Sequence, residues 1–231
     1  MTRFCFVMEI QVWGRLISGT KDQPRRMEGE GQVLTSSDVS SLVIDSLCDQ
    51  AKGQNAAVTC FYFDFAVQKE QSSTCMLGAL LKQAVGGLRE VPGEIQRAYQ
   101  DQKKVIGGRG PQISDIVKMM QTTSSEKPTF ICIDALDECL AEHRVKLLNS
   151  LNQILQKSPG TRIFVTGRPH IQDEIKKRLS GRVATICITP RRSDIIRYLQ
   201  NRLDEDTTPD AMDSSLEADI LKKIPKDISE M

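Results

Sequence analysis

The sequence predicts an α/β fold with a doubly wound, mostly parallel sheet covered by helices on both faces, which is a three-layer α/β/α arrangement. Short runs of branched and aromatic residues, typical of strands, alternate along the chain with apolar residues at helical spacing. The 231 residues, of which 39% are hydrophobic, suit one domain with a sizeable core rather than two domains. Sheets of this kind bind ligands outside the carboxyl ends of their strands.

Four apolar runs predict strands, and seven periodic stretches predict helices. The strands are expected at residues 58–63, 129–133, 162–166 and 184–188, and the helices at residues 39–47, 74–85, 94–104, 113–120, 147–155, 195–203 and 214–224. Gly107, Gly108 and Gly110 predict a flexible loop rather than a phosphate loop, because no strand precedes them. The alternation therefore places the polar residues that follow each strand at one edge of the sheet.

The two ends of the chain fit this pattern least. Residues 4–13 and 15–17 are interpreted as two strands, and residues 21–26 as an exposed linker. We therefore expect residues 1–32 to form an atypical amino-terminal segment, and residues 33–231 to form a core that is truncated at its carboxyl end.

The composition excludes several classes of partner. With 31 basic and 30 acidic residues the formal charge is +1, so no general attraction to nucleic acid or to an anionic membrane is expected. No apolar stretch approaches the length of a membrane span, and polar residues interrupt the first apolar run too early for a signal sequence. The seven cysteines, an odd number, indicate reduced thiols in a cytoplasmic protein rather than a disulfide framework.

An apolar run that ends in three acidic residues is the most informative feature of the sequence. The run begins at Phe130 and leads into Asp134, Asp137 and Glu138. Burying unpaired charge costs several kcal/mol per group, so a cation or several donors must lie nearby. We expect Asp134 to bind Mg²⁺, and Asp137 and Glu138 to orient or deprotonate a water molecule. The alternative is a strand that runs into a solvated turn and an acidic helix start.

Other residues near these strands have simpler interpretations. Cys132, Cys139 and His143 lack the spacing of zinc ligands, so a core or surface role is expected. Asp64, which follows the first predicted strand, is interpreted as a turn cap, and His170 as a surface histidine.

Three segments together resemble a known family. They are the run ending in Asp-Ala-Leu-Asp-Glu-Cys at residues 134–139, the run Arg-Ile-Phe-Val-Thr-Gly-Arg-Pro at 162–169, and Val-Thr-Cys-Phe-Tyr-Phe-Asp-Phe at 58–65. In this order and spacing they resemble the NACHT-type (STAND) P-loop NTPase domain, and in particular the nephrocystin-3-like amino-terminal segment of fungal NOD-like receptor proteins. The resemblance covers residues 33–231.

The resemblance implies a P-loop NTPase fold that binds Mg²⁺ with ATP or GTP. It implies that Asp134 is the Walker B metal carboxylate, that Asp137 or Glu138 positions the hydrolytic water, and that Arg168 is the sensor arginine that contacts the γ-phosphate. A guanidinium suits this role because it keeps its charge and donates two parallel hydrogen bonds. The alternative for Arg168 is a salt bridge to the neighbouring acids. The family also implies protein partners, with an effector domain before this segment and a repeat domain after it.

The phosphate-binding loop that the family requires is degenerate. A functional loop needs glycines, a lysine for the β- and γ-phosphates and a hydroxyl for Mg²⁺. The candidate loop contains Gly29 and Gly31, but Gln32 stands where the lysine is expected, Glu30 adds a negative charge, and Thr35 is left as the hydroxyl. Both changes oppose nucleotide binding. A mis-spliced or truncated gene model would give the same pattern, and helix-terminal N–H donors would still offer a weak anion site.

Three functions are consistent with these observations. The first is a NACHT-like nucleotide-switch signalling module whose binding and hydrolysis of nucleotide are impaired. The second is a non-enzymatic pseudo-NTPase scaffold that presents surfaces to partner proteins. The third is a metal-dependent hydrolase or phosphotransferase that uses the acidic cluster without a phosphate loop. The sequence makes no prediction about the oligomeric state.

Overall fold

The strands of this protein assemble into one mixed sheet. The computed structural model describes residues 4–9, 36–104, 110–179, 183–188, 192–204 and 213–229. Within them the sheet has five strands in the order β2-β3-β4-β1-β5. The strands are β1 (Phe4–Glu9), β2 (Ala57–Tyr62), β3 (Thr129–Asp134), β4 (Thr161–Gly167) and β5 (Val183–Ile188). The neighbours β2, β3 and β4 are parallel, whereas β1 is antiparallel to both β4 and β5.

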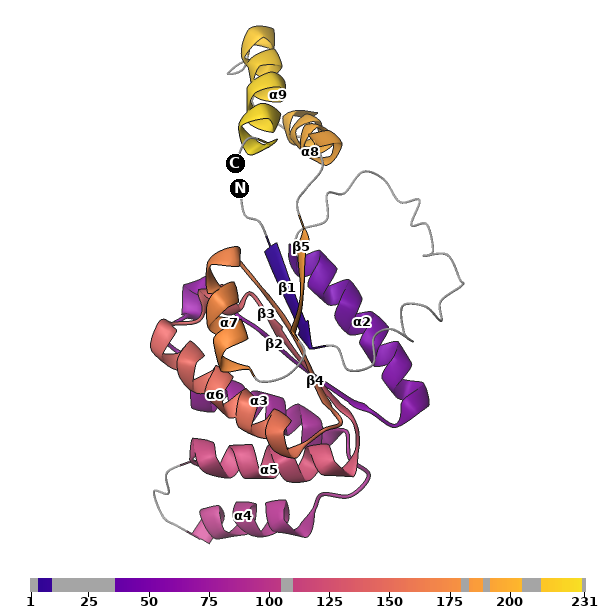
Figure 1. Cartoon of the computed structure of the whole chain (residues 1–231), viewed down its shortest axis with the longest axis vertical. Coiled ribbons are helices and arrows are strands. Elements are labelled where there is room, and N and C mark those ends of the chain that lie inside the picture. Colours follow the sequence, from indigo (N-terminus) through magenta and orange to yellow (C-terminus); the bar gives the residue numbers. More distant parts are fainter. Residues whose placement is uncertain are drawn as a thin grey trace.

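Helices cover both faces of this sheet, as Figure 1 shows. The α-helices are α2 (Ser36–Gln54), α3 (Ser73–Gly86), α4 (Gly93–Lys104), α5 (Ile113–Glu126), α6 (Ala141–Lys157), α7 (Gln172–Arg178), α8 (Arg192–Asp204) and α9 (Ser214–Ser229). Three short 3₁₀ turns are η1 (Phe65–Val67), η2 (Leu136–Glu138) and η3 (Pro169–Ile171). Helix α2 lies on one face, whereas α3, α5, α6 and α7 lie on the other, and α8 packs against α9.

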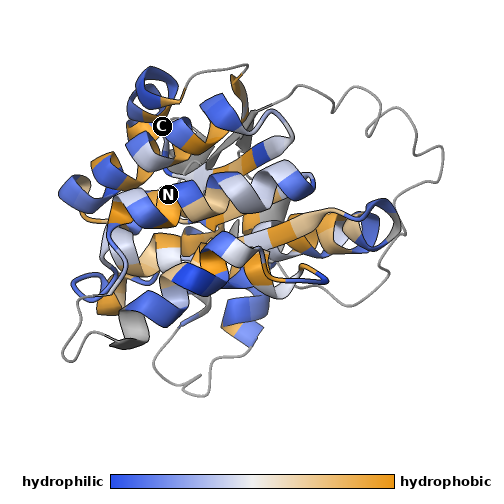
Figure 2. Ribbon diagram, turned by 90° about the horizontal axis from the view of Figure 1, so that it is seen from below, coloured by the Kyte–Doolittle hydropathy of each residue, from blue (hydrophilic) through white to orange (hydrophobic). Residues whose placement is uncertain are grey.

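The core follows from the alternation of side chains along the central strands. Ile131 and Ile133 of β3 belong to the large core under α3, α5, α6 and α7, while Cys132 between them packs with Phe164 and α2. Successive side chains of a strand point to opposite faces, so a strand apolar at every position must be covered on both sides. In Figure 2 the helices alternate between hydrophilic and hydrophobic stretches, the pattern of helices with one buried face.

These elements confirm the α/β/α fold class and the four strands and seven helices expected from the sequence, with strand ends moved by at most one residue and helix ends by up to seven. The segment expected as a strand at 4–13 forms β1 over residues 4–9. The expected strand at 15–17 and the linker at 21–26 lie outside the described residues. Helix α7 and the three 3₁₀ turns were not expected.

Strand β1 runs antiparallel to both of its neighbours, unlike a strand of a parallel sheet. Phe4 pairs with Ile188 and Glu9 pairs with Val183, so β1 begins where β5 ends. The amino end of β1 thus lies at the edge where β4 and β5 have their carboxyl ends. The carboxyl end of β1 lies at the opposite edge.

Two further features of the described part of the chain concern membrane spans and disulfide bonds. None of the helices that the structure describes is both long and apolar enough to cross a bilayer. The described cysteines with free thiols are Cys48, Cys60, Cys75, Cys132 and Cys139.

Candidate functional site

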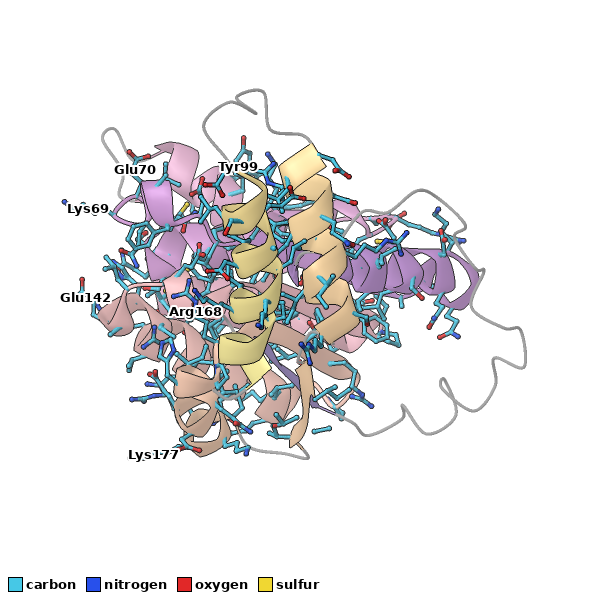
Figure 3. The ribbon with its side chains drawn as sticks, turned by 90° about the horizontal axis from the view of Figure 1, so that it is seen from above. Lys69, Glu70, Tyr99, Glu142, Arg168 and Lys177 are labelled. Carbon is cyan, nitrogen blue, oxygen red and sulfur yellow. The ribbon has the colours of Figure 1, made fainter. Side chains whose placement is uncertain are left out.

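The candidate site lies at the edge where the parallel strands β2, β3 and β4 end. The backbone N–H of Phe63 donates to the carbonyl of Asp134 at 3.1 Å, so the ends of β2 and β3 are level. Arg168 follows the last residue of β4. Figure 3 looks onto this edge and shows Arg168 well inside the outline, whereas Lys69, Glu70 and Glu142 lie at its rim. The polar ends of the three strands therefore converge, as the sequence predicts.

Asp134, the last residue of β3, is a buried carboxylate held by two hydroxyl groups. Asp134 is only 4% exposed. The hydroxyls of Ser40 in α2 and Thr166 in β4 each donate to Asp134 Oδ1 at 2.5 Å. The Thr166 hydroxyl also accepts the backbone N–H of Ala135 at 2.9 Å, which directs its own proton toward the carboxylate. These donors stabilise the charge that burial would otherwise penalise.

The chain turns sharply after Asp134. Ala135 has a left-handed backbone with φ of 53°, a region that disfavours residues with a Cβ atom. The next residue, Leu136, is fully buried and anchors the turn η2. This local geometry presents Asp137 and Glu138 at the edge of the sheet instead of continuing the strand.

Asp137 forms a two-point contact with Arg168. Its Oδ1 accepts the backbone N–H of Arg168 at 3.1 Å, and its Oδ2 lies 3.3 Å from Arg168 Nε. The Asp137 side chain is 5% exposed, whereas that of Arg168 is 53% exposed. A Cβ atom on Gly167 would lie 2.7 Å from Ile171 Cδ1 and 3.3 Å from Asp137 Oδ1, so glycine makes room for this contact. The salt bridge weighed as the alternative for Arg168 is thus present, and half of the side chain remains open to solvent.

Glu138 turns away from Asp134 toward the end of β2. Its Oε2 accepts the backbone N–H of Phe65 at 3.0 Å, and its backbone carbonyl accepts the side-chain amide of Gln68. Partial burial, and next the nearby charge of Asp137, raise the pKa of Glu138 above its ordinary value. A carboxylate with a raised pKa is a stronger base than an ordinary carboxylate, so Glu138 is better suited to proton abstraction.

The remaining residues singled out from the sequence take modest places. Asp64 caps η1, because its Oδ1 accepts the backbone N–H of Ala66 at 2.8 Å, so the capping interpretation is confirmed. His170 lies exposed in η3. The expected phosphate-loop residues lie outside the described part of the chain: Gly29, Gly31, Gln32 and Thr35.

Two residues of the site were not assigned from the sequence. Ser40 lies in the second turn of α2, and only the docking of that helix brings it to Asp134. Thr166 was part of the quoted motif but was given no role. In the structure Ile133 pairs with Val165, so the next residues, Asp134 and Thr166, are level. A hydroxyl at that position of β4 was the signal.

The residues present fit a hydrated magnesium ion with phosphate. In the described residues no three histidines, cysteines or acids are grouped to hold a metal. Magnesium does not require such a group, because it binds through one or two carboxylates and keeps several waters. Asp134 and the Ser40 hydroxyl are hard oxygen groups that lie together, and because both are buried and hydrogen-bonded to each other, an ion would have to displace this contact to bind them. The half-exposed guanidinium of Arg168 offers a phosphate contact.

Comparison with known proteins supports the nephrocystin-3-like part of the family resemblance. A family model described as Nephrocystin 3, N-terminal matches residues 36–168, which is more than half of the chain. No curated protein and no solved structure matches the chain. The match begins at the first residue of α2 and ends at Arg168, so it contains every described residue of the site. The chain therefore belongs to the Nephrocystin 3, N-terminal family.

Proposed function

We propose that this chain is a NACHT-like nucleotide-switch signalling module whose binding and hydrolysis of ATP or GTP are impaired. The convergence at one sheet edge of buried Asp134, the Ser40 hydroxyl and the Asp137–Arg168 pair is the observation that carries this proposal. These groups match the metal side and the γ-phosphate side of a nucleotide site. Protein partners in the cytoplasm are part of the same proposal.

Each residue has a role that follows from its chemistry. Asp134 and Ser40 would hold Mg²⁺, which neutralises phosphate charge when bound. Arg168 would exchange part of its contact with Asp137 for phosphate oxygens, which its exposed side chain allows. Asp137 lies beside the arginine, and Glu138, whose pKa is raised, would orient or deprotonate the attacking water.

The impairment has two sources. Gln32 replaces the lysine that reaches the β- and γ-phosphates, so a permanent charge is lost. In addition, β1 occupies the place between β4 and β5 but runs antiparallel to both. A phosphate loop normally joins the carboxyl end of one strand directly to a helix at the ligand edge, whereas β1 has its carboxyl end at the other edge and α2 begins at the ligand edge, where Ser40 meets Asp134.

The scaffold function is the second candidate, and the direction of β1 favours it. A protein that only presents surfaces needs the sheet and its helices but not a loop that encloses phosphates. The two functions differ in one measurable property, which is magnesium-dependent binding of nucleotide.

Titration of the purified chain with ATP and with GTP by calorimetry, with Mg²⁺ or with EDTA, tests the proposal. We expect weak, magnesium-dependent binding at millimolar nucleotide, and its loss in Asp134→Asn. The matched control is Asp173→Asn, which removes one exposed carboxylate from α7 and should leave binding unchanged. Absence of magnesium-dependent binding by the wild-type chain would contradict the nucleotide switch and favour the scaffold.

A second pair of substitutions tests the cause of the impairment. Replacing Gln32 by lysine and Val33 by threonine, with Gly31 unchanged, restores the sequence Gly-Lys-Thr at residues 31–33. If the missing lysine limits affinity, the double variant should bind nucleotide at least tenfold more tightly, which corresponds to about 1.4 kcal/mol. Unchanged affinity would assign the impairment to the direction of β1 instead.

A further inference from the structure

Arg144 connects the acidic turn η2 with the helix that follows Arg168. Its Nη1 donates to the backbone carbonyl of Cys139 at 2.9 Å, and its Nε donates to Glu174 Oε2 at 2.8 Å. Cys139 is the residue that ends η2, and Glu174 lies in the first turn of α7. One side chain from α6 therefore joins the turn that contains Asp137 to the helix that begins four residues after Arg168.

The contacts of Arg144 are largely shielded from water. Its side chain is 13% exposed and that of Glu174 is 23% exposed, so water competes little for either group. Pairs that are exposed contribute little, whereas a partly buried guanidinium with two acceptors in fixed directions restricts its partners more strongly. Arg144 thus fixes the distance between η2 and α7.

The acidic turn is held from its other side as well. The carbonyl of Glu138 accepts from Gln68, which follows β2, while the next carbonyl, that of Cys139, accepts from Arg144. Two successive carbonyls are therefore anchored to opposite neighbours. A turn held in this way cannot shift relative to α7 unless the Arg144 contacts break.

We propose that Arg144 is a positioning residue of the candidate site, which holds the turn of Asp137 against the helix after Arg168 and so keeps their two-point contact in place. Its importance for nucleotide rests on the proposed function. The contact itself does not, because it is present between residues of this chain alone.

Nuclear magnetic resonance of the nucleotide-free protein tests this role directly. The backbone N–H and the Nε–H of Arg168 both face Asp137, and their ¹⁵N signals can be assigned by comparison with Arg168→Lys. In Arg144→Gln we expect the Nε–H signal to be lost through exchange with water and the backbone N–H signal to move upfield. A thermal melt of each variant checks that it is folded.

The matched control is Arg178→Gln. Arg178 Nε lies 3.3 Å from the other oxygen of the same Glu174, and its Nη1 donates to Asn149, but neither contact involves η2. Both Arg168 signals should therefore stay in place in this variant. An equal change in Arg178→Gln would overturn the proposal, because the effect would then be one of general stability around Glu174.

Two further results complete the test. If Arg144→Gln does not fold, Arg144→Lys keeps the charge and the aliphatic stem but lacks the planar fork, and it is expected to lose the Nε–H signal of Arg168. Unchanged Arg168 signals in a folded Arg144 variant would overturn the proposal. Calorimetry with magnesium and ATP is read separately: a wild-type chain that binds no nucleotide contradicts the proposed function, whereas the nucleotide-free spectra alone decide the role of Arg144.

Discussion

Replacement of Thr166 by valine tests whether hydroxyl groups stabilise the buried carboxylate of Asp134. Valine has nearly the same shape, and Thr166 is only 1% exposed, so water does not replace the lost group. The change removes one donor to Asp134 Oδ1 and leaves the backbone N–H of Ala135 without its acceptor. We expect the folded protein to lose stability through both effects.

The size of this loss can be worked out from the contacts. A hydrogen bond to a charged group contributes about 1.5–3 kcal/mol, and a buried N–H without an acceptor costs about 1–3 kcal/mol. The Ser40 hydroxyl still donates to the same oxygen, so the lower half of each range applies and the sum is about 3 kcal/mol. For a chain of this length, each kcal/mol lowers the melting temperature by about 2–4 °C, which gives a fall of about 6–12 °C.

Urea and thermal unfolding followed by circular dichroism measure this loss, with Thr161→Val as the matched control. Thr161 lies in the same strand and is also 1% exposed, but its hydroxyl has no hydrogen-bond partner in the described part of the chain. Its replacement should leave stability unchanged or raise it by up to about 1 kcal/mol. If Thr166→Val is as stable as Thr161→Val, the hydroxyl does not stabilise Asp134 and the reasoning is refuted.

Three further outcomes are expected. A thiol reagent should modify the exposed Cys75 of the native protein well before Cys139, because burial raises the pKa of the Cys139 thiol to about 12, and mass spectrometry of peptides locates the label. Glu138→Gln should become more stable relative to wild type as the pH rises above the ordinary pKa of a glutamate, measured by urea unfolding. Burial and Asp137 raise the pKa of Glu138 in the folded state, so the wild type loses stability as Glu138 ionises, whereas glutamine carries no proton to lose. Ala135→Gly should be neutral or up to about 1 kcal/mol more stable in thermal melts, because glycine removes the strain at a φ of 53°.

Each of these outcomes has its own control. Equal labelling rates of the two cysteines in the folded state would contradict the burial argument. Glu142→Gln, at a side chain that is 70% exposed, controls for the loss of one negative charge, and a pH trend equal to that of Glu138→Gln would contradict the assigned cause. Ala84→Gly, at a buried position of α3, should destabilise the protein by about 1 kcal/mol or more, so an equal loss at Ala135 would show that no strain is relieved there.

The position of the site could be predicted from the sequence because it depends on where strands end. Asp134 and Arg168 each follow an apolar run, and parallel strands bring such ends to one edge. Their convergence therefore needed no knowledge of packing. The salt bridge between Arg168 Nε and Asp137 was one of the two alternatives that the sequence left open, whereas the contact of Asp137 with the Arg168 backbone was not foreseen.

The parts that could not be predicted depend on long-range contacts. A short apolar run identifies β1 as a strand but carries no direction, so its antiparallel pairing with β4 was not foreseen. Ser40 reaches Asp134 across 94 positions of sequence, and the periodicity of α2 shows which face is apolar but not which turn meets β3. Helix α7 has only 7 residues, too few for a helical period to stand out.

The polar contacts of the site also stabilise the fold, so the site residues have a role that does not depend on nucleotide. Thr166 joins β4 to the carboxylate at the end of β3, and Asp137 joins η2 to the segment after β4. Loss of Thr166 would remove one donor from a buried carboxylate, and loss of Asp137 would remove the acceptor of the Arg168 backbone N–H, so each change costs stability whether or not nucleotide binds. Selection for stability alone would therefore retain Asp134, Asp137 and Thr166, whereas Gln32 stands at a position where the family resemblance implies a lysine that only phosphate binding requires. Arg168, with half of its side chain in solvent, contributes least to stability in this group, so its effect on nucleotide affinity separates function from folding most clearly.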